Sequence, residues 1–245
     1  HADIGEQFLQ RGIHVLVEKP IAHTLEDADR LVRAAAAGGR VLQVGHLERF
    51  NPAVAKLREI VSRPRFFESH RLGSFTPRSL DIDVVLDLMI HDLDIIGSLV
   101  RSRVAGVQAV GIAILTGRID IANARIIFED GCVANITASR VSADKVRKLR
   151  LFQKHQYISL DYTRQDVTVT GLEQTREGGL PEIVSRRLTP ENREPLREEL
   201  DAFLRAVRGI GPVECTGGDG RRALALALEI LAQAERAQAL EIDRS

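Results

Sequence analysis

The sequence lacks an excess of either charge and has no long hydrophobic run. Its 34 basic residues equal its 34 acidic residues, so there is no overall positive field to attract nucleic acid or an anionic membrane. No apolar run approaches the roughly 20 residues that cross a bilayer, and no signal-peptide pattern opens the chain. We therefore expect a cytoplasmic protein with neither nucleic-acid nor membrane partners.

Cysteine is also scarce. The two cysteines, Cys132 and Cys215, lie far apart and match no metal-ligand spacing, which predicts reduced, buried thiols with neither a disulfide framework nor a metal site. The 245 residues are 44% hydrophobic and 28% charged, a composition typical of a globular protein of one or two domains.

Hydrophobic patterning predicts two kinds of structure in succession. Residues 1–46 alternate helix and strand, with continuous apolar strands at 13–17 and 40–45, which is typical of a parallel sheet covered on both faces. Residues 51–62 and 84–100 look helical, the latter apolar nearly all round, and 65–73 look like a strand. From 103 to about 169, six strand-like stretches follow one another as an antiparallel meander, and two helices end the chain, the second with Asp219 as its N-cap.

The predicted fold is therefore α/β plus α+β: part of a parallel sheet, then an open antiparallel sheet with helices on one face. One face of the open sheet is expected to be apolar and to include Ile112, Ile114, Ile126, Phe128 and Ile136. The other face is expected to carry the polar side chains of Asn123, Arg125, Asn135 and Arg140. Smaller residues are expected to keep parts of that face flat: Val110, Ala113, Ala122 and Ala124.

The first candidate site is the segment "HVLVEKPIAH", in which Glu18, Lys19 and Pro20 follow an apolar strand. Ligands of open parallel sheets bind beyond the carboxyl ends of the strands, so Lys19 could reach a substrate hydroxyl there. Pro20 restricts Lys19 to an extended conformation, and the bond between them could be cis. An ordinary surface charge pair at a strand end explains the same residues equally well.

The second candidate is "VVLDLMIHDLDII", where a regular helix would place Asp87, His91 and Asp94 on one stripe of an otherwise apolar surface. A carboxylate one turn from a histidine can orient it for acid/base catalysis. The alternatives are a core histidine satisfied by its neighbour and, less favoured, a His-Asp-Asp metal site.

A third group, "GHLERFNPA", presents His46, Glu48, Arg49 and Asn51 where the second strand ends. Arg49 could bind a carboxylate or phosphate, although a charge cluster at a helix N-terminus is the simpler interpretation.

Together, "VEKPIA", "GHLERFNPA" and "DLMIHDLD" resemble the Gfo/Idh/MocA family of NAD(P)-dependent sugar oxidoreductases over essentially the whole chain. The resemblance implies a Rossmann cofactor domain, its C-terminal part at residues 1–46, and a substrate-binding and oligomerisation domain at 47–245. It implies catalytic roles for Lys19, Asp87 and His91 and cofactor contacts for Glu18, Lys19 and Pro20. It implies substrate contacts for Lys19, Arg49, Asn51 and Asp94. Arg71 is added to this group as a candidate partner of a sugar nucleotide.

The glycine-rich dinucleotide fingerprint of such a domain is absent from this sequence, which we interpret as an N-terminally truncated fragment that binds the cofactor poorly by itself. The segments further resemble the branch that acts on nucleotide-linked sugars, with Arg71, Arg78 and Arg140 as candidate diphosphate partners.

The expected function is hydride transfer between a sugar secondary hydroxyl and NAD or NADP. The alternatives are a non-catalytic sugar-nucleotide binding or regulatory module and an interaction scaffold that uses the open sheet. The resemblance also implies a homodimer or homotetramer that pairs through this sheet.

Overall fold

The structure is a computed structural model that describes residues 1–77, 81–173, 181–191 and 193–242, except for the side chains of 238–242. Arg78, one of the candidate diphosphate partners, lies outside the described residues. Among the helices of these ranges, none combines the length and hydropathy that crossing a membrane requires.

The N-terminal part is a small parallel α/β unit, in agreement with the predicted order of elements. Helix α1 (Ala2–Gln10) and strand β1 (Val15–Glu18) are followed by α2 (Leu25–Gly38) and β2 (Leu42–Gly45). The two strands pair in parallel from Val15 opposite Leu42 to Glu18 opposite Gly45, so both carboxyl ends lie at the same edge.

The ends of α2 follow from local sequence. The Thr24 hydroxyl accepts a hydrogen bond from the Asp27 amide at 3.1 Å, which caps the first turn. Gly39 ends the helix at φ 58°, a left-handed conformation that costs glycine little.

An eight-stranded sheet dominates the rest of the chain, in the order β10-β9-β8-β7-β3-β6-β5-β4. The antiparallel meander was predicted incompletely, because β3 lies between β6 and β7, parallel to β6 and antiparallel to β7. The strand β10 was not predicted. The strands are β3 (Pro64–Leu72), β4 (Val104–Ile112), β5 (Ile121–Phe128), β6 (Val133–Ser139), β7 (Val146–Gln153), β8 (Gln156–Asp161), β9 (Asp166–Glu173) and β10 (Glu182–Leu188).

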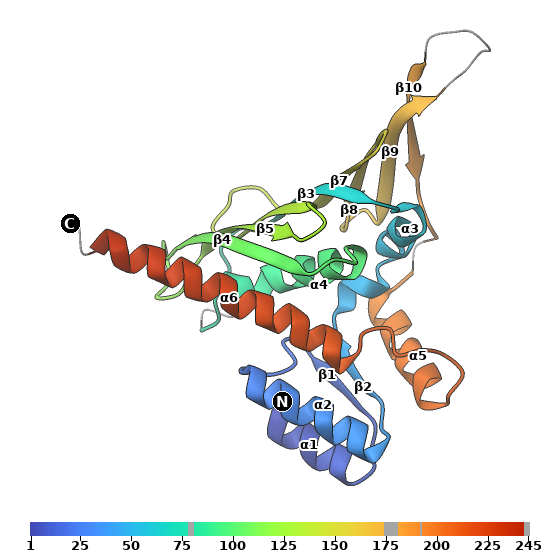
Figure 1. Ribbon diagram of the computed structural model, residues 1–245, viewed down its shortest axis with the longest axis vertical. Coiled ribbons are helices and arrows are strands. Elements are labelled where there is room, and N and C mark those ends of the chain that lie inside the picture. Colours follow the sequence, from blue (N-terminus) through green and yellow to red (C-terminus); the bar gives the residue numbers. More distant parts are fainter. Residues whose placement is uncertain (78–80, 174–180, 192, 243–245) are drawn as a thin grey trace.

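Helices cover one face of this sheet and separate it from the small parallel unit (Figure 1). The long helix α6 runs across both parts and packs directly on β4, and α4 lies against both α6 and the sheet. Besides the two short segments η1 (Leu47–Phe50) and η2 (Val85–Met89), the remaining helices are α3 (Pro52–Ile60), α4 (Ile90–Leu99), α5 (Pro195–Val207) and α6 (Gly217–Ile242). The mixed α/β class with an open sheet is therefore confirmed.

Helix α6 begins differently from the prediction. Thr216, and not Asp219, is the residue before the first helical position, and its hydroxyl accepts a hydrogen bond from the Asp219 amide at 3.1 Å. The Asp219 carboxylate in turn accepts from the Thr216 amide at 2.8 Å. The two residues form a reciprocal capping pair, in which Asp219 takes the inner position.

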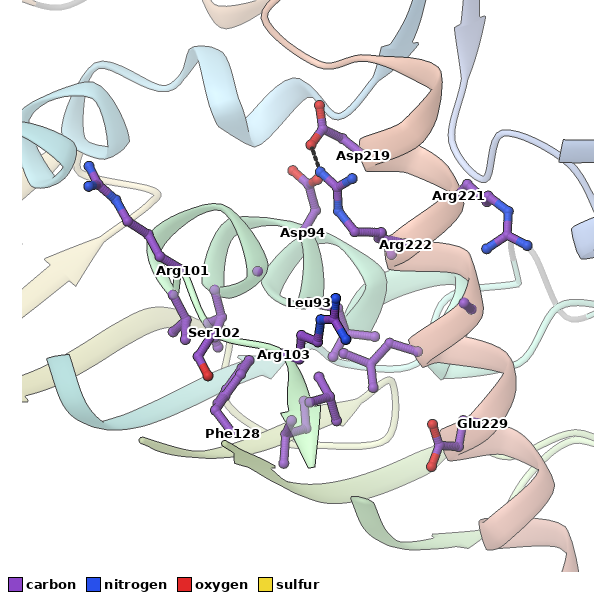
Figure 2. Close-up of a pocket in the computed structure, with 18 of the residues that line it drawn as sticks. Leu93, Asp94, Arg101, Ser102, Arg103, Phe128, Asp219, Arg221, Arg222 and Glu229 are labelled. Carbon is purple, nitrogen blue, oxygen red and sulfur yellow. Dashed lines mark hydrogen bonds and ion pairs between the residues drawn. The ribbon is translucent and has the colours of Figure 1, made fainter. Parts of the chain in front are cut away.

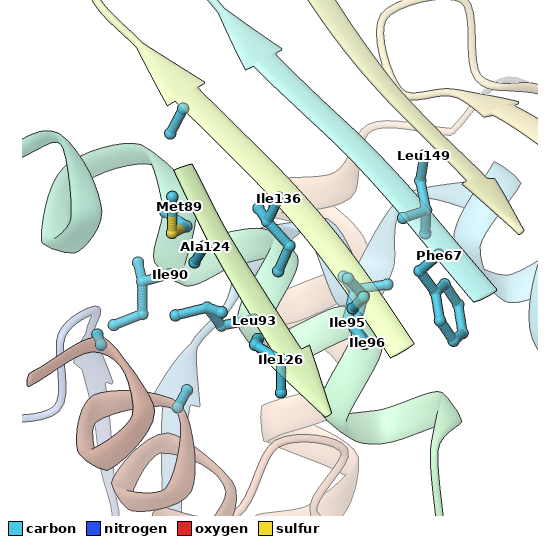
Figure 3. Close-up of a cluster of buried hydrophobic side chains, with 14 of the residues drawn as sticks. Phe67, Met89, Ile90, Leu93, Ile95, Ile96, Ala124, Ile126, Ile136 and Leu149 are labelled. Carbon is cyan, nitrogen blue, oxygen red and sulfur yellow. The ribbon is translucent and has the colours of Figure 1, made fainter. Parts of the chain in front are cut away.

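The main hydrophobic core lies between α4 and the sheet (Figure 3). Leu93, Ile95 and Ile96 of α4 are almost fully buried, as are Ile126 and Ile136 of the facing strands. A second core, beneath the small sheet, contains residues of 2–44 and also Cys215 and Leu224. Because α6 contributes to both cores, the domain boundary after residue 46 stays a prediction.

The predicted sheet faces are wrong at several positions. Ile112 and Ile114 are 52% and 54% exposed, whereas Ala122 and Ala124 face the core. The physical reason is close packing of α6 on β4: a side chain at Gly111 would meet Ile119 and Ala234 at 3.1 Å or less. Gly111 therefore takes the core-facing position. Arg140, expected on the open face, is also buried.

Ile126→Ala should lower the free energy of unfolding by about 2 to 5 kcal/mol, because it removes fully buried methylene groups and leaves a cavity. Ile112→Ala, on the neighbouring strand but half exposed, is the matched control and should cost less than about 1 kcal/mol. Urea unfolding of both variants checks the assignment; equal losses would contradict the observed faces.

Candidate active site

Lys19 lies directly after β1 and reaches across to the second part of the chain. Its ammonium group donates to the main-chain oxygen of Asp87 at 2.7 Å and lies 3.4 Å from the Asp87 carboxylate oxygen Oδ1. The bond between Lys19 and Pro20 is cis. The two side chains are 19% and 30% exposed, so both remain accessible to a small molecule.

The segment that carries Asp87 is not the continuous α-helix that the sequence predicts. Residues Val85–Met89 form a π-helical turn, and α4 starts only at Ile90. The expected stripe of Asp87, His91 and Asp94 assumed 100° per residue, which a wider turn does not keep. Such turns are frequent at functional sites, and here the Asp87 carbonyl serves as an acceptor for Lys19.

His91 is partly buried, and its Nδ1 atom has no hydrogen-bond partner among the described residues. Its ring lies edge-on to that of His46, with centroids 6.5 Å apart and an interplanar angle of 86°. Burial lowers the pKa of His91 well below its ordinary value, and the positive charges of Arg71 and Lys19 lower it further. The imidazole is therefore neutral near pH 7.

Asp87 does not orient His91 by a hydrogen bond in the described part of the chain; its carboxylate is paired with Lys19. His46, which follows β2, is buried, and both of its ring nitrogens lack a hydrogen-bond partner within the same residues. The sequence pointed to His46 only as part of the "GHLERFNPA" segment. Its place at the carboxyl edge of a parallel strand was the signal that marked it.

Arg49 and Asp94 form a buried ion pair behind this group. The guanidinium donates from Nε and Nη2 to the two carboxylate oxygens at 2.7 and 2.6 Å, and from Nη1 to the Glu214 carbonyl at 2.8 Å. Asp219 lies 3.5 Å from Nη1. Arg49 is 8% exposed and Asp94 is 3% exposed. Together with the bond to Glu214, this buried pair connects η1, α4 and the segment before α6.

Arg71 and Asn51 also have partners within the protein. Arg71 donates to Asp92 at 2.8 Å and to Glu48 at 2.9 Å, and its guanidinium lies 4.8 Å from the centre of the Tyr162 ring. Asn51 caps α3 by accepting from the Ala53 amide at 3.0 Å and donates to the Tyr162 carbonyl at 3.1 Å.

These contacts explain Arg49, Asp94, Arg71 and Asn51 structurally, so a substrate-binding role for them stays a prediction. Arg140 lies apart from this group, beside the Ile82 carbonyl and 3.8 Å from Asp120.

Glu199 of α5 is a further buried acid, 1% exposed, that the sequence pattern did not mark. Burial raises its pKa to about 7, and the charge of Glu18 adds to the increase. It sits beside Gln43 of β2, whose side-chain amide nitrogen lies 3.4 Å from the Glu199 carbonyl. Glu199 thus lies where α5 approaches β2, near enough to Glu18 for the two acids to affect each other.

One group of potential metal ligands, His46, Asp94 and Cys215, lies within 4.8 Å in the described residues. Both oxygens of Asp94 already accept hydrogen bonds from Arg49, and a fixed positive charge at that distance disfavours a cation. Burial also raises the pKa of the Cys215 thiol, which opposes the thiolate that a metal needs. The arrangement favours an ion pair and not a metal centre.

Comparisons with known proteins agree with this architecture. Residues 1–46 match the Gfo/Idh/MocA oxidoreductase family, which is described as having an NAD-binding Rossmann fold. The chain is 38% identical over 231 residues to UDP-N-acetylglucosamine 3-dehydrogenase of Acidithiobacillus ferrooxidans, an alignment that covers 94% of this chain and 74% of the relative.

Solved structures show the same fold. That of the Acidithiobacillus enzyme superimposes with a TM-score of 0.89 at 37% identity and covers 96% of this chain and 75% of the other. A levoglucosan dehydrogenase in complex with NADH and L-sorbose gives 0.82 at 18% identity, with 96% and 75% covered. With close similarity along nearly its whole length, this chain belongs to the Gfo/Idh/MocA family of oxidoreductases.

Proposed function

We propose that the protein is an NAD(P)-dependent dehydrogenase that oxidises a secondary hydroxyl of a nucleotide-linked sugar, with the reverse reduction also possible. The single observation that carries the proposal is the contact between Lys19 and Asp87, which brings a partly exposed ammonium group from a strand end to the turn before His91. Similarity to a nucleotide-sugar 3-dehydrogenase supports the substrate class.

The residues fit a nicotinamide cofactor at the edge where β1 and β2 end. Glu18, Lys19 and Pro20 lie there, and the nitrogens of His46 and the Nδ1 of His91 lack partners in the described chain. Such buried groups are costly unless a ligand or water satisfies them. The cofactor, when bound, would accept or supply the hydride.

Lys19 would hold the reacting oxygen. An ammonium group has three N–H donors, and the Asp87 carbonyl and carboxylate account for two of them. The third can donate to the sugar oxygen and stabilise negative charge as it develops there. In this arrangement Asp87 positions Lys19. The sequence pattern instead predicted that Asp87 orients His91.

His91 would take the hydroxyl proton during oxidation and return it during reduction. Because its lowered pKa keeps the imidazole neutral at pH 7, it is ready to act as the base. The resulting imidazolium would be unstable beside Lys19 and Arg71, so it would readily release the proton to solvent after oxidation. In the reductive direction, the imidazolium would give its proton to the alkoxide oxygen as the hydride adds to the carbonyl carbon.

In the full-length protein, we expect His91→Ala and Lys19→Ala to lower kcat by about 100-fold or more, as for loss of an acid/base or of a donor to a developing alkoxide. Steady-state assays with UDP-N-acetylglucosamine and NAD or NADP would measure kcat, and cofactor fluorescence would show unchanged cofactor binding. His70→Ala is the control, because His70 lies on the opposite, open face of the large sheet. Full activity of the full-length His91 variant would contradict the mechanism. A full-length wild-type protein that binds the sugar nucleotide but forms no NAD(P)H would favour the binding-module alternative.

The pH profile should carry the signature of a depressed histidine. A base must be unprotonated, so kcat/KM should fall only as the pH drops through the lowered pKa of His91, below the ordinary value of 6.5. An acid limb centred at or above pH 6.5 would contradict the assignment. Titration of the histidine ring signals by NMR, with His91→Ala to identify the resonance, provides an independent measurement.

We also propose a homodimer that pairs through the open face of the large sheet. An aromatic group lies on this face, with the rings of Phe66 and Phe152 5.6 Å apart and those of Phe152 and Tyr157 5.0 Å apart. Phe152 is 38% exposed and Val110 is 47% exposed. Apolar side chains on an uncovered sheet face favour burial against a second copy.

Sedimentation at tens of micromolar should show a dimer, with upwards of roughly 1,000 Å² buried. Phe152→Lys should shift the protein to a monomer because it places a charge at the proposed contact. Leu200→Lys, at an exposed residue of α5, should leave the assembly unchanged. A monomeric wild-type protein would exclude this interface and leave the catalytic proposal intact.

A further inference from the structure

A pocket of about 520 Å³ lies between α4, α6 and the start of β4 (Figure 2). None of the proposed catalytic residues Lys19, Asp87 and His91 lines it. Arg49 and Asp94, which form an ion pair, line one part of it. Asp94 also lies 3.8 Å from His46 of the candidate active site. We refer to it as the α4–α6 pocket.

The floor of the α4–α6 pocket is apolar. Leu93 and Ile96 of α4 contribute to it, as do Ile126 and Phe128 of β5, and each of these side chains is at most 4% exposed. Gly97, which also lines the pocket, leaves open space: a side-chain carbon added there would have no neighbour within 4 Å. An apolar body of modest size could therefore enter without displacing the core.

The polar residues around this floor differ in whether they already have partners. Arg222 is paired with Asp219, and Arg221 turns away across α6 and pairs with Asp29. Arg101 and Arg103 flank Ser102 just before β4 and are exposed. Their guanidinium groups have no hydrogen bond or ion pair to any residue that the structure describes, although the Arg103 carbonyl accepts from the Glu129 amide at 2.9 Å.

Two unpaired guanidinium groups beside an apolar floor favour an anion. Arginine binds carboxylate and phosphate oxygens in pairs, and it loses less hydration energy on doing so than lysine. Glu229 of α6 also lines the pocket, and Figure 2 shows it away from Arg101. A second anionic group near Glu229 would be repelled, so the ligand should have one charged end.

We propose that the α4–α6 pocket is a second ligand site, separate from catalysis, that binds a small amphiphile with one carboxylate or phosphate head and an apolar body. The head group contacts Arg103, whose side chain extends toward Leu93 in Figure 2, and the apolar body lies over Leu93, Ile96 and Phe128. Arg101, whose side chain extends the other way, adds positive charge at the rim of the pocket. The proposal does not depend on the dehydrogenase function.

Calorimetric titration with decanoate and with decyl phosphate tests the site and distinguishes the two head groups. Binding of at least one of them, with no binding of decanol or of inorganic phosphate at the same concentrations, is the expected result. Replacing both arginines, Arg101→Ala with Arg103→Ala, should weaken binding about tenfold or more, as expected from losing charge-assisted hydrogen bonds. Arg63→Ala, at another exposed arginine, is the matched control.

Gly97→Phe fills the pocket and should abolish binding, whereas Gly117→Phe, at another glycine with open space around it, should not. Thermal unfolding of both variants confirms that they fold. The proposal is overturned if neither amphiphile binds at millimolar concentration, if Gly97→Phe binds as well as Gly117→Phe, or if the arginine substitutions leave binding unchanged. It is equally overturned if Gly97→Phe converts a dimer into monomers in sedimentation, because the pocket is then an interface between copies.

Discussion

The buried ion pair between Arg49 and Asp94 determines where the other elements of the site can lie. Arg49 lies in η1, which follows the last strand of the small parallel sheet, and Asp94 belongs to α4, the helix that carries His91. Removing one partner of such a pair leaves an uncompensated buried charge, at a typical cost of 3–5 kcal/mol. The two bonds to the carboxylate and one to the Glu214 carbonyl therefore hold the strand ends, α4 and the beginning of α6 in one arrangement.

The contact between Lys19 and Asp87 is less buried and depends on that arrangement. The 2.7 Å hydrogen bond from Lys19 to the Asp87 carbonyl requires η2, the turn before α4, to stay close to the end of β1. Structural residues and the proposed catalytic residues thus lie along the same short segment. Asp92 and Asp94 are buried and paired with arginines, whereas Asp87 stays partly exposed beside Lys19.

Much of this organisation was predictable from the sequence, because hydrophobic runs identify buried strands and a proline after Lys19 limits how the chain can leave β1. The π-helical turn at Val85–Met89 was not predictable, since it changes the hydrogen-bond spacing without changing the apolar pattern. The pairing of Arg71 with Asp92 was also missed: contacts between residues distant in sequence leave no periodic signal. The exposed position of Ile112 follows from the close approach of α6 to Gly111, a tertiary effect that strand alternation cannot express.

Helix α6 has a consequence for how the molecule loses its structure. Leu224 belongs to the core under the small sheet, whereas Ala227, Ile230 and Ala234 belong to the core under the large one. A rigid helix shared in this way transmits local melting of one core to the other, so the two cores should behave as one cooperative unit in native-state hydrogen exchange. The amide protons in the middle of α6 would then exchange only through global opening and would be among the slowest in the chain.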